Sequence, residues 1–133
     1  MKVFADTNFL VSAFATRGLS ADVFQVILAE HQIMTGEFVL TELQRVLTTK
    51  LKVPAKIVRE AEQLLRRHHI EPVPDQPLEI KVRDEDDRWV LESALRTGAE
   101  VLITGDKDLL DISEKVTELK IVSPRMFWEL IQK

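Results

Sequence analysis

The sequence contains no cysteine, which excludes disulfide bonds, thiolate zinc sites and cysteine nucleophiles. The absence of disulfides is consistent with a cytoplasmic protein. No apolar run approaches the roughly 18–20 residues that cross a bilayer, and no signal peptide is expected at the N-terminus. Positive charge is not in excess either. The net charge of −4 argues against nucleic-acid binding over the whole surface, although it allows a local basic patch.

The chain has 133 residues, of which 45% are hydrophobic and 30% charged, and residues 1–133 are expected to fold as one globular domain. Short apolar runs alternate with segments of helical periodicity. These patterns predict strands at 2–5, 32–35, 101–104 and 119–122. They predict helices at 8–14, at 37–50, from Pro54 to about His69, at 86–97 and from Pro124 onward, and one further helix with Ser20 as its N-terminal cap. A helical turn is predicted at 106–111 and an extended segment at 71–77. Strands that alternate with helices predict an α/β fold with a parallel sheet covered on both faces.

Asp6 is a charged residue between two segments that are expected to enter the core. The apolar residues 3–5 precede it and the apolar residues 9–11 follow it closely. An ionised group away from water costs several kcal/mol unless it is paired or bound to a metal. Asp106 follows the predicted strand 101–104 by two residues. If the two strands are neighbours, both carboxylates lie at the carboxyl edge of the sheet, where α/β proteins bind ligands.

Two further acids depart from helical periodicity. Glu42 lies three residues after Val39, the first residue of an inward-facing apolar stripe, and Asp87 is the first member of the stripe that continues with Val90 and Leu91. Each acid also has an ordinary structural explanation. A carboxylate at position 87 or 106 stabilises a helix N-terminus, and Glu42 can extend out of the flank of its stripe.

Four acids from separate elements that meet in one crevice would repel one another. Two carboxylates about 4 Å apart repel by ~4 kcal/mol at an effective dielectric constant of about 20. A hard divalent cation removes this cost, and Mg²⁺ or Mn²⁺ takes oxygen ligands together with substrate phosphate. The sequence therefore favours a Mg²⁺ or Mn²⁺ site. None of His31, His68 and His69 falls in the predicted crevice.

These residues resemble the PIN-domain family, which is widespread among toxins of bacterial and archaeal toxin–antitoxin pairs. The resemblance is carried by Asp6-Thr7-Asn8, by Glu42 in TELQRVL and by RDEDDRWVLESALRTGAEVLITGDKDLL at 83–110. It implies a three-layer α/β/α domain with a central parallel sheet of four to five strands. It also implies a Mg²⁺- or Mn²⁺-dependent endoribonuclease that cleaves single-stranded RNA.

Carried over to this chain, the metal-binding and catalytic quartet is Asp6, Glu42, Asp87 and Asp106. Asn8 and Thr104 match supporting positions, and Thr7, Asp86 and Asp108 are further candidates for support around the site. The family pattern D-P-D-D-D is changed here, because Glu85 replaces the proline and Arg88 the last acid. The third acid is therefore open among Asp84, Asp86 and Asp87, and the periodicity favours Asp87.

Positive charge for gripping RNA is concentrated between residues 50 and 67, where six Lys or Arg residues stand against two Glu. A solvated helix face explains this pattern equally well. The predicted RNA-binding residues are Arg17, Lys50, Lys52, Lys56 and Lys107. The apolar residues Phe127, Trp128 and Ile131 of the last helix are expected to pack in the core, with a contact to an antitoxin or to a second copy of the chain as the alternative.

Two other functions remain to be weighed. A non-catalytic PIN-like module would bind RNA or a protein, but such a module is expected to lose at least one acid of the quartet. A phosphatase with Asp6 as nucleophile would need a second acid two residues later, where this chain has Asn8. The prediction is therefore a toxin-type ribonuclease, with RNA as substrate, a cognate antitoxin as partner and no membrane association.

Overall fold

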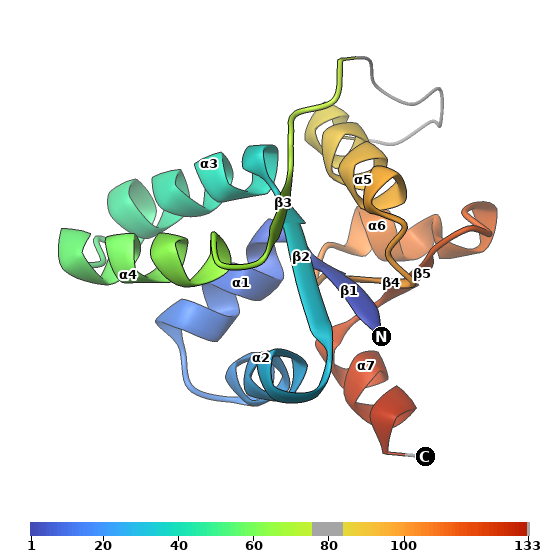
Figure 1. Ribbon diagram of the computed structural model, residues 1–133, viewed down its shortest axis with the longest axis horizontal. Helices are drawn as coiled ribbons and strands as arrows, with labels where there is room; N and C mark the ends of the chain where they lie inside the picture. Colours follow the sequence, from blue (N-terminus) through green and yellow to red (C-terminus); the bar gives the residue numbers. More distant parts are fainter. Residues whose placement is uncertain (76–83, 133) are drawn as a thin grey trace.

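The computed structural model describes residues 1–75 and 84–132. Its centre is one parallel sheet in the order β3-β2-β1-β4-β5 (Figure 1). The strands are β1 (Lys2–Ala5), β2 (Gln32–Gly36), β3 (His69–Glu71), β4 (Val101–Ile103) and β5 (Lys120–Val122). The predicted α/β fold with a parallel sheet of four to five strands is confirmed.

Helices flank the sheet on both faces, as the α/β/α prediction requires. The α-helices are α1 (Thr7–Ala15), α2 (Leu19–Glu30), α3 (Glu37–Arg45), α4 (Ala55–Leu65), α5 (Glu85–Thr97), α6 (Lys107–Asp111) and α7 (Pro124–Ile131). A π-helix, η1 (Val46–Lys50), continues α3, and a 3₁₀-helix, η2 (Ser113–Lys115), follows α6. None of the helices in the described parts of the chain is both long and apolar enough to span a bilayer.

Strands β1 and β4 lie in the middle of the sheet, and their sequences explain that position. Every residue of Val3–Ala5 and Val101–Ile103 is buried. Continuous apolar runs of this kind are typical of strands covered on both faces. Strand β1 pairs with β2 on one side and with β4 on the other, so the strand order reverses between β1 and β4. Open α/β sheets bind their ligands beyond such a switch point.

The prediction of one helix from Pro54 to about His69 is wrong. Helix α4 ends at Leu65, and His69–Glu71 forms the edge strand β3, paired with β2. Strand β3 has three residues, of which only Ile70 is apolar. This pattern is too short to distinguish an edge strand from a continuation of the preceding helix. The predicted extended segment 71–77 overlaps this strand at its first residue. Residues 76 and 77 of the predicted segment, and Arg83 of the family motif, lie outside the described residues.

The predicted helix 37–50 is divided into two parts. Helix α3 ends at Arg45, and residues Val46–Lys50 continue as a π-helix. Apolar periodicity does not distinguish the two helix types over five residues. The strand predicted at 101–104 ends at Ile103, so that Thr104 lies just beyond it and its side chain is available to the neighbouring turns.

Candidate active site

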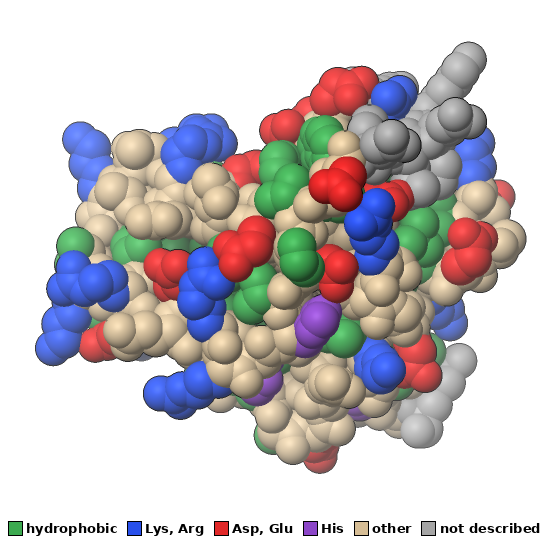
Figure 2. Space-filling model, turned by 45° about the horizontal axis from the view of Figure 1, so that its top comes forward, with side chains coloured by type: hydrophobic (Ala, Val, Ile, Leu, Met, Phe, Trp, Pro, Cys, Tyr) green, Lys and Arg blue, Asp and Glu red, His purple; other side chains and the backbone are tan. Residues whose placement is uncertain are grey.

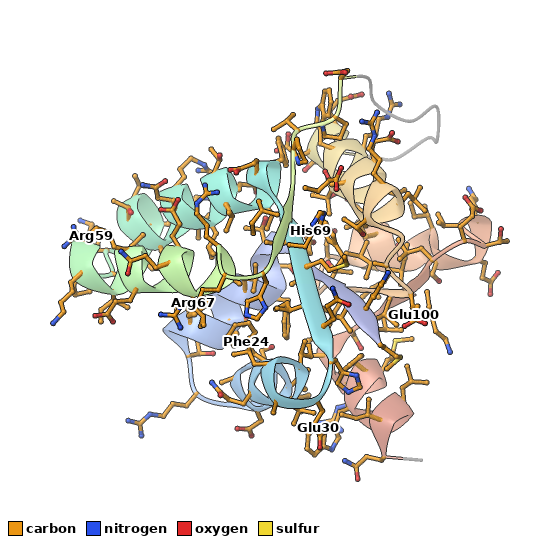
Figure 3. All side chains as sticks on the ribbon, viewed as in Figure 1. Phe24, Glu30, Arg59, Arg67, His69 and Glu100 are labelled. Carbon is orange, nitrogen blue, oxygen red and sulfur yellow. The ribbon has the colours of Figure 1, made fainter. Side chains whose placement is uncertain are left out.

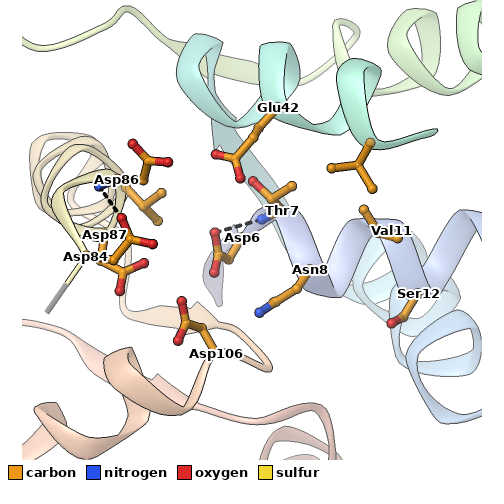
Figure 4. A pocket seen from close by; sticks show the side chains of 12 residues that line it. Asp6, Thr7, Asn8, Val11, Ser12, Glu42, Asp84, Asp86, Asp87 and Asp106 are labelled. Atoms are coloured by element: carbon orange, nitrogen blue, oxygen red, sulfur yellow. Dashed lines mark hydrogen bonds between the residues drawn. The ribbon is translucent and has the colours of Figure 1, made fainter. Parts of the chain in front are cut away.

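A pocket of about 310 Å³ lies at the carboxyl edge of the sheet beside the β1–β4 switch point. Six of the side chains that line it are carboxylates, contributed by the starts of α1, α5 and α6 and by the middle of α3 (Figure 4). The acids are Asp6, Glu42, Asp84, Asp86, Asp87 and Asp106; the other lining residues are Thr7, Asn8, Val11, Ser12, Val46 and Val90. Among the described residues that line the pocket there is no lysine, arginine or histidine. The structure therefore brings the predicted quartet together in a strongly acidic cavity.

Asp6 is fixed by two hydrogen bonds at the point where β1 passes into α1. Its Oδ1 accepts a hydrogen bond of 2.7 Å from the backbone N–H of Thr7, which makes it the N-cap of the helix. Its Oδ2 accepts one of 2.7 Å from the hydroxyl of Thr104. The residue is only 5% exposed, and burial raises the pKa of Asp6 to about 6 in spite of both bonds. The nearby carboxylates of Asp106 and Glu42 raise this pKa further.

Thr104 and Asn8 connect the turn after β1 to the turn after β4. The Thr104 hydroxyl donates to Asp6 and accepts a hydrogen bond of 2.9 Å from the backbone N–H of Asp106. The side-chain oxygen of Asn8 accepts one of 2.8 Å from the backbone N–H of Gly105. These bonds hold the backbone and side chains around Asp6 and Asp106 together. Thr7 is buried, and its hydroxyl has no hydrogen-bond partner within the described residues.

Asp87, Asp106 and Asp108 form the tightest carboxylate group. One carboxylate oxygen from each lies within 4.8 Å of the others. Asp106 also caps α6, because its Oδ1 accepts a hydrogen bond of 2.9 Å from the backbone N–H of Asp108. Asp87 is 5% exposed, and its Oδ2 is buried without a hydrogen-bond partner among the described residues. Burial, and next the Asp106 carboxyl group, raise the pKa of Asp87 well above its ordinary value.

The remaining acids surround this group from α3 and from the start of α5. Glu42 is half-buried, and burial together with the charges of Asp86 and Asp84 raises its pKa. Asp84 is the N-cap of α5, since its Oδ1 accepts a hydrogen bond from the backbone N–H of Asp86. Both Asp84 and Asp86 are exposed, whereas Asp87 is buried. All three candidates for the third acid thus line the pocket, and burial distinguishes Asp87 from the other two.

The predicted RNA-binding residues lie outside the pocket. All five are exposed, and none of them lines it: Arg17, Lys50, Lys52, Lys56 and Lys107. Arg17 follows the C-cap of α1 and is separated from Asp6 by the length of that helix, whereas Lys107 is adjacent to Asp106. Lys and Arg side chains gather at the end of the molecule formed by α3 and α4 (Figure 2), and Arg59 projects outward there (Figure 3).

Arg45 is a residue that the sequence patterns did not single out. It is exposed on the last turn of α3, three residues after Glu42. The positive charges of Arg45 and Lys50 act on Glu42 and oppose the rise in its pKa. Helical spacing alone could have identified Arg45, because residues three apart lie on the same side of a helix.

The donor set fits a hard divalent cation. The pocket offers carboxylate oxygens from four segments, one buried carboxylate oxygen without a hydrogen-bond partner, and no positively charged side chain in its described lining. Mg²⁺ and Mn²⁺ prefer oxygen ligands of this kind and retain several waters. Burial, and after it the neighbouring carboxyl groups, raises the pKa values of Asp6, Glu42 and Asp87, so keeping these groups ionised in the pocket has an energetic cost that a bound cation would offset.

The profile of the PIN-domain family matches residues 2–108, a range that contains the whole quartet. No curated protein sequence matches the chain significantly.

Solved structures share the fold at low sequence identity. VapBC2 of Rickettsia felis, bound to a DNA fragment from its promoter, aligns with a TM-score of 0.63 at 14% identity over 92% of this chain and 98% of that chain. The Mycobacterium tuberculosis toxin VapC20, which cleaves the Sarcin-Ricin loop, aligns with a TM-score of 0.61 at 16% identity over 82% and 93%. The PIN domain endonuclease Utp24 aligns with a TM-score of 0.52 at 19% identity over 92% and 84%. At these identities the likeness establishes the fold.

Proposed function

Because the chain belongs to the PIN-domain family, we propose that it is a divalent-metal-dependent endoribonuclease that cleaves single-stranded RNA. The observation that carries the proposal is the convergence of six carboxylates on one pocket whose described lining contains no cation. A purely structural cluster of this kind would be costly, since a buried charge is retained only where it is paired or bound to a metal.

Asp6, Glu42, Asp87 and Asp106 would hold Mg²⁺ or Mn²⁺, with the buried and unpartnered Oδ2 of Asp87 as one ligand atom. When bound, such an ion supplies positive charge to the phosphodiester and promotes deprotonation of the attacking water. Asp108 lies close enough to Asp87 and Asp106 to support the same group.

The other residues of the site position these acids. Thr104 holds the carboxylate of Asp6 and the backbone of Asp106 in one hydrogen-bonded unit, and Asn8 holds the adjacent Gly105. Preorganisation of this kind favours catalysis, because the acids do not have to be rearranged when substrate binds. Of the further candidates for support, Asp86 adds negative charge near Glu42, and the backbone N–H of Thr7 bonds to Asp6.

RNA binding would rely on the exposed cations Lys50, Lys52 and Lys56 at the α3–α4 end and on Lys107 beside Asp106. Arg17, at the far end of α1 from Asp6, would contact a more distant part of the substrate. Counterion release from RNA makes such contacts sensitive to salt. We therefore assign these residues to substrate affinity.

We further propose that the chain is the toxin of a cytoplasmic toxin–antitoxin pair, a role supported by the family and by the likeness to VapBC2 and VapC20. Partners would be RNA, a cognate antitoxin and a second copy of the chain. Phe127 is buried in the core, and Trp128 and Ile131 are half-buried and pack against it, as predicted. Trp128 and Ile131 also line a groove together with residues of α2, and this groove is the candidate surface for a protein partner. A small reading frame encoded next to this one, with a DNA-binding N-terminal region, would support the pair.

The test is cleavage of a fluorescent single-stranded RNA with Mn²⁺, with EDTA, and with the variant Asp6→Asn. Asp22→Asn is the matched control, because Asp22 is exposed on α2 and lies outside the pocket. Cleavage should require the metal and Asp6 but not Asp22. Cleavage that persists in EDTA would overturn the metal dependence, and tight RNA binding without cleavage would indicate a non-catalytic module.

A further inference from the structure

At one end of the pocket, the lining that the structure describes contains no carboxylate. Beyond the acids, α1 contributes Val11 and Ser12, and η1 contributes Val46. Val11 and Ser12 lie away from the carboxylate cluster along α1 in Figure 4. We call these three residues the neutral wall. Resting on the proposed function, we propose that the neutral wall binds a nucleobase of single-stranded RNA beside the phosphodiester that is cleaved.

Helix geometry places the neutral wall one turn beyond the acids. Val11 follows Thr7 by four residues and Val46 follows Glu42 by four, a rise of about 6 Å along each helix. Both α1 and α3 begin at the carboxyl edge of the sheet, and α1 contacts both α3 and η1. The two helices therefore present the same order of groups along the pocket: acid-site residues first, then a valine from each side.

The two valines of the neutral wall differ in their packing: Val11 packs against the core, whereas core packing does not account for Val46. It is half-buried and lines the pocket, and it is not one of the half-buried apolar side chains that pack against the core within the described residues. It is also the first residue of the π-helix, a rare conformation that is frequent at functional sites. An apolar side chain kept beside six carboxylates is expected where a neutral part of a ligand has to be bound.

The charge pattern matches the alternation of groups along an RNA strand. Phosphate would lie at the carboxylates together with the metal, and the uncharged face of a base suits the two valines, with the Ser12 hydroxyl available to a base edge. Beyond the wall, Lys50 ends η1, so positive charge is available to the next phosphate, and Arg17, which follows α1, is available to a more distant one. Bases of single-stranded RNA are free to be bound in this way, whereas stacked and paired bases are not.

The test combines changes in the wall with removal of single bases from the RNA. A short single-stranded RNA and a set of copies, each with one abasic position, are titrated against Asp6→Asn protein with and without Val46→Ala, and binding is measured by fluorescence anisotropy. Kinetic constants of the protein with Asp6 intact are measured in Mn²⁺. Val46→Thr keeps the shape of the side chain and adds a hydroxyl, and Val73→Ala, at an exposed position outside the pocket, is the matched control.

Val46→Ala should weaken RNA binding and raise KM about 10-fold, the usual effect of a lost apolar contact in a binding pocket. Removal of the base at one position of the RNA should weaken binding by the same factor. Val46→Ala protein should bind this abasic RNA no more weakly than either change alone predicts. Val46→Thr should act in the same direction as Val46→Ala, and Val73→Ala should have no effect. Equal binding of intact and abasic RNA, or additive losses, would overturn the base subsite even if RNA is cleaved. Base-dependent binding through Val46 without any cleavage would instead refute only the proposed ribonuclease.

Discussion

Strands β1 and β2 both run directly into an acid at the start of a helix, but the two acids have opposite surroundings. Glu37, after β2, is partly exposed and accepts two hydrogen bonds of 2.7 and 3.0 Å from the guanidinium group of Arg66, which lowers the pKa of Glu37. Asp6, after β1, is buried among other carboxylates, and its pKa is raised to about 6. The chain thus provides a cation for Glu37, whereas the described residues that line the pocket of Asp6 provide none. Acids that the fold leaves uncompensated are the ones expected to bind an external cation.

The largest difference between the two acids should appear in cleavage. Asp6→Asn should lower the rate of RNA cleavage on the order of a thousandfold, because loss of a metal ligand removes several kcal/mol of transition-state stabilisation. Glu37→Gln should leave the rate within about twofold of the unchanged protein. Both rates are measured on the same RNA in Mn²⁺. Similar losses of cleavage rate in the two variants would show that the different surroundings of Asp6 and Glu37 do not matter for cleavage.

Metal binding should stabilise the protein through the Asp6 pocket. At a free Mn²⁺ concentration a hundredfold above the Kd, the free energy of unfolding should rise by about 2.7 kcal/mol, which corresponds to a rise in Tm of roughly 5–15 °C. Glu37→Gln should retain the full rise, and Asp106→Asn should lose most of it. The measurement is thermal unfolding during a metal titration. An unchanged Tm in the unsubstituted protein would contradict a metal site at the carboxylates.

The pH dependence of stability should have opposite signs at the two acids. The pKa of Asp6 is about 6 in the folded chain against 3.8 ordinarily, so the folded state binds the proton more tightly. Its contribution to stability is fully present below about pH 4 and is lost as the pH rises through 6. The difference in pKa corresponds to about 3 kcal/mol. The lowered pKa of Glu37 contributes stability at neutral pH that is lost in acid.

Chemical denaturation in EDTA between pH 4 and pH 8 measures these contributions. Asp6→Asn should flatten the fall in stability toward neutral pH and should make the metal-free protein more stable at pH 7, since the amide oxygen still accepts from the N–H of Thr7. A less stable Asp6→Asn protein at pH 7 would show that the carboxylate serves the fold and not a metal.

The smallest effect is expected at the Glu37–Arg66 pair itself. Both side chains are more than a third exposed, and ion pairs of this kind contribute ~0.3–1 kcal/mol. Glu37→Gln should therefore reduce the free energy of unfolding by no more than about 1 kcal/mol at pH 7, and added salt should reduce the difference. A loss of several kcal/mol would mean that the pair, and not the core, holds α4 against α3.

The sequence patterns were sufficient for most of the fold but not for its edge. The apolar runs Val3–Ala5 and Val101–Ile103 predicted two central strands, because buried strands need continuous apolar sequence. Strand β3 was missed, since its three residues form an edge that depends on pairing with β2 and has little pattern of its own. The change from α-helix to π-helix at Val46 was missed because apolar periodicity does not distinguish the two helix types over five residues.

By itself, the sequence determined which residues are apolar at which spacing, and hence the parallel α/β fold, and which acids stand where apolar residues are expected. Only the tertiary structure decided what those acids meet. It placed Asp87 rather than Asp84 or Asp86 in a buried position, left one of its oxygens without a hydrogen-bond partner among the described residues, and put Arg17 at the far end of α1 from Asp6. The reason is physical: local periodicity fixes the face of a helix on which a side chain lies, whereas burial and pKa depend on the elements that pack against that face.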